Sequence, residues 1–142
     1  MKVSARNVFK GTVKELQDGA VNAEVVVALP GGTELVAIVT EGSVKSLGLA
    51  VGKEVFALVK APWVMLMTEG GDIRLSARNC LPGKVKSVAD GAVNAEVVLT
   101  LDGGAEVVAV VTRDAVNELG LAPGVSATAV IKASHVILGV PA

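Results

Sequence analysis

The amino-acid sequence predicts an all-β fold in which two small five-stranded barrels follow one another along the chain, each with one short helix. Three observations predict this fold. The sequence repeats itself at an offset of about 72 residues, each repeat has the pattern of short strands separated by tight turns, and one segment of each repeat carries the capping residues of a helix.

The internal repeat determines the domain organisation. Residues 4–68 align with residues 76–140 without a gap, and about half of the aligned pairs are identical. The segment SARN occurs at residues 4–7 and again at 76–79, and DGAVNAEVV recurs letter for letter at 18–26 and 90–98. A short Gly-rich connector covers residues 69–72. We therefore predict two domains, residues 1–69 and 70–142.

Turn signals divide each repeat into strands. In the first repeat, Asp18-Gly19 predicts a hairpin because glycine tolerates the positive φ of such turns. Pro30-Gly31-Gly32 marks a second turn. The strands expected in this repeat cover residues 11–17, 21–29, 34–40, 53–60 and 64–67.

The helix of each repeat is predicted from its caps. Thr40 and Thr112 are suited to begin a helix, while Gly48 and Gly120 stand where a helix would end. Five short strands with one small helix are typical of an OB-like, partly open barrel.

Some strands are apolar on both faces, which predicts burial beyond a single barrel core. Residues 25–29 and 107–111 lack the alternation of a strand with one solvated face. A module of about 70 residues has only one small core. We expect a homo-oligomer whose barrels share interfaces; the alternative is that the two repeats of one chain pack against each other.

Composition and charge argue against several functional classes. Basic and acidic residues nearly balance, 13 against 14, and aromatic residues make up 2%, whereas nucleic-acid binders usually have excess basic charge and stacking rings. No apolar stretch approaches the ~20 residues that cross a bilayer, and the first residues lack an apolar leader core. We expect a cytoplasmic protein with no nucleic-acid and no membrane partner.

The sequence contains no set of residues spaced for catalysis or for direct binding of a metal cation. His135 is the single histidine, and its counterpart in the first repeat is Trp63, so we expect a structural or surface role. Cys80 has no cysteine or histidine partner at metal-ligand spacing. Glu24 and Glu96 each stand alone within an apolar strand, without the second group that acid–base catalysis uses. We predict that the protein is not an enzyme.

Hydrogen-bond donors, by contrast, are duplicated. Each repeat offers one serine hydroxyl, one arginine, one lysine and one asparagine flanked by small residues; these are Ser4, Arg6, Lys60 and Asn22, and Ser76, Arg78, Lys132 and Asn94. Hydroxyls, amide N–H groups and one or two cations around a cavity suit an oxyanion. A duplicated fold also repeats its structural residues, so the structural interpretation stays open at this point.

These elements resemble the Mop domain of the Mop/TOBE family, which molbindins carry singly or in tandem. The matching elements are SARN, G-x-V followed by GAVNAEV, the Gly-Gly hairpin, L-G-L-x-x-G and A-x-[VI]-K-A, and they cover nearly the whole chain. The sequence shows no helix-turn-helix before the repeats and no P-loop, so we expect the stand-alone, tandem form and neither a regulator nor a transport ATPase.

The resemblance implies reversible binding of molybdate or tungstate between the barrels of a trimer, without a cofactor. It implies one class of site at Ser4, Arg6, Lys60, Ser76, Arg78 and Lys132. It implies a second class near a threefold axis, at Val21, Asn22, Ala23, Val93, Asn94 and Ala95. The Ser43 hydroxyl is a further candidate ligand contact.

The two copies differ at two of the hydroxyl positions. Ser43 is matched by Ala115, and Pro62 by Ser134. Either the two sites differ in affinity or Ser134 replaces the missing donor. The function expected is oxyanion storage or homeostasis; the alternative is a sensing module that signals molybdate status to a protein partner.

Overall fold

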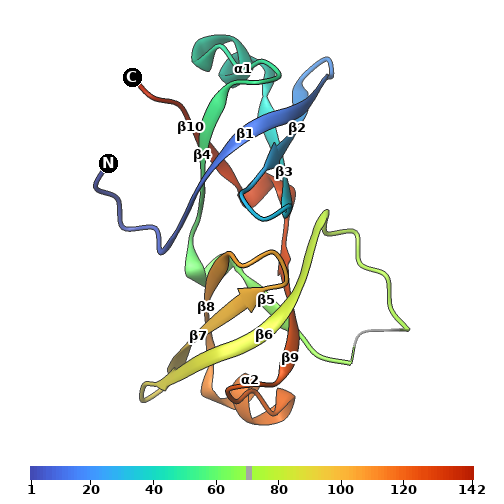
Figure 1. The fold of residues 1–142 in the computed structure, drawn as a ribbon. Coiled ribbons are helices and arrows are strands. Elements are labelled where there is room, and N and C mark those ends of the chain that lie inside the picture. Colours follow the sequence, from blue (N-terminus) through green and yellow to red (C-terminus); the bar gives the residue numbers. More distant parts are fainter. Residues whose placement is uncertain (70–71) are drawn as a thin grey trace.

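The computed structural model describes residues 1–69 and 72–142 as an elongated molecule with one barrel at each end (Figure 1). The elements of the first repeat are β1 (Asn7–Asp18), β2 (Asn22–Ala28), β3 (Glu34–Thr40), α1 (Glu41–Leu47), β4 (Glu54–Val59), the 3-10 helix η1 (Ala61–Trp63) and β5 (Met65–Met67). Those of the second repeat are β6 (Asn79–Asp90), β7 (Asn94–Leu101), β8 (Glu106–Thr112), α2 (Arg113–Leu119), β9 (Ser126–Ile131), the 3-10 helix η2 (Ala133–His135) and β10 (Ile137–Gly139). The predicted all-β class, with five strands and one short α-helix per repeat, is confirmed.

The two repeats exchange their last strands. One sheet has the order β10-β4-β1-β2-β3 and the other β5-β9-β6-β7-β8. Ile137 of β10 therefore pairs with Leu58 of β4, and Met65 of β5 pairs with Val130 of β9. In Figure 1 the red β10 lies beside the green β4 of the first repeat. Each barrel thus contains four strands of one repeat and one strand of the other.

The predicted turns and caps are present. The Gly19 N–H donates to the Asn22 carbonyl oxygen at 2.9 Å and closes the first hairpin. The Thr40 hydroxyl accepts from the Ser43 N–H at 3.1 Å at the start of α1, and Gly48 ends that helix in the left-handed region with φ 61°. Thr112 and Gly120 do the same for α2. Neither α-helix is long enough to cross a membrane.

The core lies inside each barrel, and the outer faces are half-buried. Along β2 the side chains of Ala23, Val25 and Val27 are buried, while those of Glu24 and Val26 are partly exposed. β7 repeats this pattern. The two repeats do pack against each other, because η2 lies on β3 and η1 lies on β8. Contact between repeats therefore accounts for part of the second buried face; the predicted oligomer stays a prediction.

Candidate oxyanion site

The β1–β4 ladder brings the SARN segment and the Lys-Ala segment of one repeat together. Asn7 pairs with Val59, so the adjoining residues, Arg6 and Lys60, leave the antiparallel ladder side by side. In the second repeat Asn79 pairs with Ile131, and the same geometry applies to its arginine and lysine. Two segments more than fifty residues apart thus place a guanidinium and an ammonium group at one end of each barrel.

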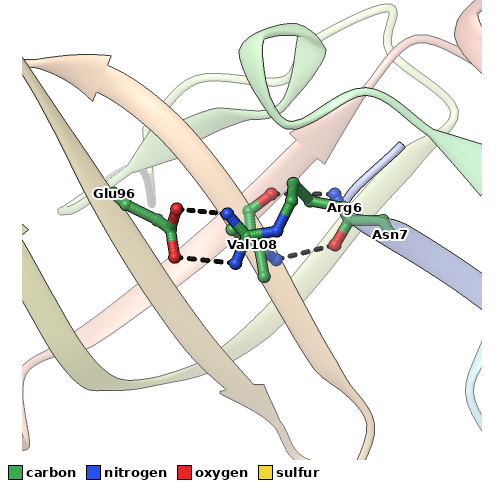
Figure 2. A network of polar contacts seen from close by, with 4 residues as sticks. All are labelled: Arg6, Asn7, Glu96 and Val108. Atoms are coloured by element: carbon green, nitrogen blue, oxygen red, sulfur yellow. Dashed lines mark hydrogen bonds and ion pairs between the residues drawn. The ribbon is translucent and has the colours of Figure 1, made fainter. Parts of the chain in front are cut away.

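The two SARN arginines form ion pairs with glutamates of the other repeat. Arg6 donates two hydrogen bonds to Glu96 on β7, at 2.5 and 2.9 Å (Figure 2). Arg78 donates two to Glu24 on β2, at 2.6 and 2.9 Å. The hydrogen bond from Arg78 lowers the pKa of Glu24, whereas the hydrogen bond to Glu96 raises the pKa of Arg6. The guanidinium groups therefore join the repeats, which sequence reasoning did not foresee.

The SARN asparagines join the repeats more firmly. The Asn7 Nδ2 donates to the Val108 carbonyl oxygen at 2.8 Å, and the Val108 N–H donates to Asn7 Oδ1 at 2.7 Å (Figure 2). Asn79 makes the same two bonds with Val36. Val36 and Val108 lie on β3 and β8, which are the last strands of their sheets. Each asparagine therefore satisfies backbone groups at a sheet edge.

Neither asparagine was among the predicted site residues. Asn7 and Asn79 are only 2% and 1% exposed, and a buried polar side chain requires hydrogen-bond partners. The available signal was the recurrence of an asparagine just before an apolar strand.

Lys60 lies beside an aromatic pair. Lys60 immediately precedes η1, and its Nζ lies 5.3 Å from the centroid of the Trp63 ring. The Trp63 ring in turn lies 5.1 Å from that of His135 of the other repeat. Lys60 and Lys132 are exposed, as are Ser4 and Ser76. These four predicted donors are therefore at the surface and accessible to a ligand.

The second predicted class of site lies at a hairpin tip that touches the start of the helix. Asn22 pairs with Thr40 across β2 and β3, and the Glu41 N–H donates to the Val21 carbonyl oxygen at 2.9 Å. The Val21 side chain is 72% exposed, while Ala23 is buried. The equivalent tip of the second repeat has the same geometry, with Val93 also 72% exposed.

A hollow of about 380 Å³ brings several of the predicted hydroxyl groups together. Asn22, Thr40 and Ser43 of the first repeat line it, and Ser134 of the second repeat joins them. The Thr40 and Ser43 hydroxyls lie 2.9 Å apart. Because η2 lies on β3, Ser134 is placed beside Ser43 and not beside Ala115. Ser134 therefore does not replace the donor that the second repeat lacks.

The helix starts also differ in charge between the repeats. Glu41 lies against Asp18, and a hydrogen bond between the two carboxyl groups raises the pKa of Glu41, with burial and the Asp18 charge adding to the rise and Lys45 opposing it. In the second repeat the equivalent residues are Asp90 and Arg113. One end of the molecule thus has a carboxyl pair where the other has opposite charges.

Over residues 1–69 and 72–142, no three or more His, Cys, Asp or Glu side chains are grouped to hold a metal ion. The candidate groups are instead the hydroxyls and the amide of the hollow and the exposed ammonium groups of Lys60 and Lys132, which suit an anion.

The fold and these donors define a class of protein: a two-barrel β protein with strands exchanged between its repeats and a donor set present in each. Both repeats match the TOBE domain family, at residues 3–66 and 75–138, and the chain belongs to this family. The resemblance drawn from the sequence motifs is confirmed.

Several proteins with similar sequences are named for molybdenum binding or transport. The chain is 50% identical over 141 residues to the molybdenum-pterin-binding protein MopA of Rhodobacter capsulatus and 51% identical over 140 residues to the molybdenum transport protein ModE of Azotobacter vinelandii. These alignments cover 99% of this chain but 53% and 52% of the relatives. The chain therefore spans about half the length of these curated relatives.

A solved structure matches over its whole length. The cytoplasmic molybdate-binding protein ModG, in a crystal form with molybdate bound, shares 65% identity with this chain and superposes with a TM-score of 0.96. The match covers 99% of this chain and 100% of ModG. The predicted fold of two tandem β domains is thus confirmed by the match to ModG.

Proposed function

We propose that this protein binds molybdate or tungstate in the cytoplasm and serves molybdenum storage or homeostasis. The observation that carries the proposal is the match over the whole chain to ModG, which is described as cytoplasmic and contains molybdate. The duplicated donors support it, because a buried dianion must exchange its water for hydrogen bonds. The proposal includes no cofactor, no catalytic step and no nucleic-acid or membrane partner.

The first class of site is assigned to the end of the β1–β4 ladder and its equivalent. The guanidinium of Arg6 is already paired with Glu96, so we assign its backbone N–H to the ligand, together with the Lys60 ammonium and the Ser4 hydroxyl. Ser76, Arg78 and Lys132 have the same roles in the second repeat. The second class is assigned to the hairpin tips, with Val21, Asn22, Ala23, Val93, Asn94 and Ala95, and Ser43 adds a hydroxyl.

Assembly into a homo-oligomer, as a trimer, is part of the proposal. Single exposed apolar side chains are ordinary, but here they occur at equivalent positions of both repeats. Val21 and Val93 are each 72% exposed, and Met65 and Ile137 are 56% and 53% exposed. A second copy that covers these residues would bury apolar surface and complete sites between barrels.

A melting experiment tests the proposal. Added molybdate should raise the melting temperature, because a ligand that binds only the folded state stabilises it by mass action. The double variant Lys60→Ala/Lys132→Ala should lose most of this rise. The matched control is Lys14→Ala/Lys86→Ala, which removes the same charge from equivalent exposed positions of β1 and β6. An unchanged melting temperature at millimolar molybdate and tungstate contradicts the proposal.

A second candidate function is a sensing module that signals to a protein partner. It is favoured by relatives about twice as long as this chain, among them a ModE of Yersinia pestis described as a transcriptional regulator, of which the match covers 52%. The barrel and the ligand would be the same. A pull-down from lysate with and without molybdate separates the two functions, since only the sensing module retains a partner in a ligand-dependent manner.

A further inference from the structure

The sulfur-containing side chains gather in one sheet of the molecule. The sequence has one cysteine and three methionines. Apart from the N-terminal methionine they are Met65 and Met67 of β5 and Cys80 of β6. Both strands pair with β9, one on each side of it. The strand exchange brings the three together, because β5 belongs to the first repeat but lies in the sheet of the second.

The strand register places the three sulfur atoms on the outer face of this sheet. Val130 of β9 is the partner of both Met65 and Cys80, and residues opposite each other across strands share a face. The next row of the same strands packs in the core and consists of Leu66, Ala129 and Leu81. Because successive residues of a strand point to opposite faces, Met65 and Cys80 point outward, and Met67 points outward with them.

A ligand can reach these sulfur atoms from solvent. Met65 is 56% exposed, Cys80 is exposed and Met67 is half-buried. Met67 also lines a hollow of about 270 Å³ together with Pro82 and other residues of the same sheet. The Cys80 thiol makes one long contact, to the Ala77 carbonyl oxygen at 3.7 Å, which holds it only weakly.

The spacing suits a metal ion held between sulfur atoms. Two strands that flank a third lie about 10 Å apart. A thiol on one strand and an extended thioether on the other span this gap when an ion lies between them. Methionine is unbranched and flexible, so the Met65 side chain can extend over Val130 toward Cys80, and Met67 approaches from the next row.

We propose that Cys80, Met65 and Met67 bind one copper(I) ion. Thiolate and thioether sulfur are soft ligands, which select soft ions such as copper(I) over magnesium or calcium. The Cys80 thiol releases its proton to solvent on binding, so the thiolate charge balances that of the ion, and the thioethers add neutral ligands. The equivalent positions of the first barrel carry no sulfur; they are Val8, Ile137 and Gly139.

Metal binding and assembly involve one residue in common. Met65 is among the exposed apolar residues that a second copy is proposed to cover. The ion and the second copy would therefore compete for this face. Bound copper(I) should lower the fraction of oligomer.

The test is titration with copper(I) under anaerobic conditions, in the presence of a chelator that competes for the ion. Native mass spectrometry counts the ions per chain and the chains per assembly, and near-ultraviolet absorption reports the copper–thiolate bond. We expect one ion per chain. Cys80→Ser should lose both the added mass and the absorption, and Met65→Leu/Met67→Leu should lose the ion to the chelator although it keeps the thiol.

The matched control moves the thiol to the other barrel. Cys80→Ser/Val8→Cys places it at the equivalent exposed position, where the cross-strand row ends in Ile137 in place of Met65. This variant should lose the ion to the chelator. Adding Ile137→Met and Gly139→Met to it should restore one ion per chain.

The outcomes separate a site built from three sulfur atoms from a reactive thiol alone. Failure of the unmodified protein to hold copper(I) overturns the proposal. Equal retention of the ion by the moved thiol, or by Met65→Leu/Met67→Leu, overturns it too. Copper(I) bound to the intact oligomer supports the site and places the second copy on another face. Cys80→Ser should keep the rise in melting temperature with molybdate, which verifies its fold independently of copper.

Discussion

At the scale of single residues, the SARN segment separates into side chains with different energetic roles. Asn7 is buried and forms hydrogen bonds with both backbone groups of Val108. The side chain of Arg6, by contrast, is 54% exposed although it forms an ion pair with Glu96. Exposed ion pairs contribute little because water screens them, while unsatisfied buried polar groups are costly.

We therefore expect Asn7→Ala to lower the free energy of unfolding more than Arg6→Ala. The asparagine variant leaves the Val108 N–H and carbonyl without partners, a loss of about 2 kcal/mol, whereas the loss of the water-screened Arg6 ion pair should be smaller. Urea unfolding of both variants measures the difference. Equal losses in the two variants would contradict the greater contribution assigned to the buried asparagine.

The carboxyl pair of the first repeat predicts a pH dependence. The pKa of Glu41 is raised above its usual 4.5 by the hydrogen bond to Asp18, by burial and by the Asp18 charge. The folded state therefore holds this proton more tightly than the unfolded state, so stability falls as pH rises from the unfolded pKa through the folded one.

Glu41→Gln keeps a hydrogen-bonding side chain without the charge and should remove this loss. The variant should melt higher than the unmodified protein at pH 7 and show a smaller difference at pH 4.5. Thermal melts between pH 4.5 and pH 8 measure the effect, and Glu118→Gln, on the exposed surface of α2, serves as the charge control. Parallel pH curves for all three proteins would contradict the prediction.

The lowered pKa of Glu24 acts in the opposite direction, since its stabilisation is lost on acidification. This contribution is the same in all three proteins.

Sequence reasoning found the repeated donors but not their mutual contacts. Ser4, Arg6 and Lys60 were grouped from motif resemblance, and the β1–β4 register places Arg6 and Lys60 side by side. The partners of Arg6 and Asn7 lie about ninety and one hundred residues away in the other repeat. No local pattern encodes such a distance, so these roles required the fold.

At the scale of elements, the two Gly-Gly hairpins meet between the barrels. Gly31 and Gly32 both have positive φ, +90° and +95°, a conformation that side chains rarely adopt. They differ in their surroundings, because a Cβ on Gly31 would collide with the Gly103 carbonyl oxygen and a Cβ on Gly32 would meet nothing within 4 Å.

This difference gives a matched pair of variants. Both Gly31→Ala and Gly32→Ala incur backbone strain of about 1 kcal/mol, but only Gly31→Ala also pushes the two hairpins apart, at a further cost of about 1–3 kcal/mol. Chemical denaturation should show the larger loss for Gly31→Ala. Losses of equal size would mean that the hairpins do not press on each other.

The elements themselves were largely predictable from local signals. Thr40, Gly48 and the Asp18-Gly19 turn were assigned from capping and turn chemistry, and the structure confirms them. The register shift between Val13 and Glu15 left no such signal. The exchange of the last strands was not predictable either, since β5 and β10 are equivalent and either can pair with β4 through the same backbone hydrogen bonds.

At the scale of the whole molecule, the chain is one structure and not two linked barrels. Each sheet includes a strand of the other repeat, and two asparagines and two arginines add bonds between them. The predicted boundary between residues 69 and 70 touches residues outside the described ranges and stays a prediction drawn from the duplication. Separating the barrels in space would require β5 and β10 to leave their sheets.

Cutting the connector should therefore leave the molecule intact. A protease site inserted between Ile73 and Arg74, both exposed and outside the strands, would divide the backbone into two pieces of similar length. We expect the cleaved protein to keep its uncleaved mass in native mass spectrometry and to separate only in denaturant. Release of two half-sized fragments without denaturant would contradict the exchange of strands.

The pairing of β10 with β4 also has a consequence during protein synthesis. The ribosome completes residues 137–139 about eighty residues after it completes β4, so the first barrel emerges with an unpaired edge and stays incomplete until β10 has been synthesised. Unpaired edges invite association between chains. A nascent chain of this design gains a closed first barrel only when β10 has been made, so a chain that stops before β10 does not contain the first barrel in finished form.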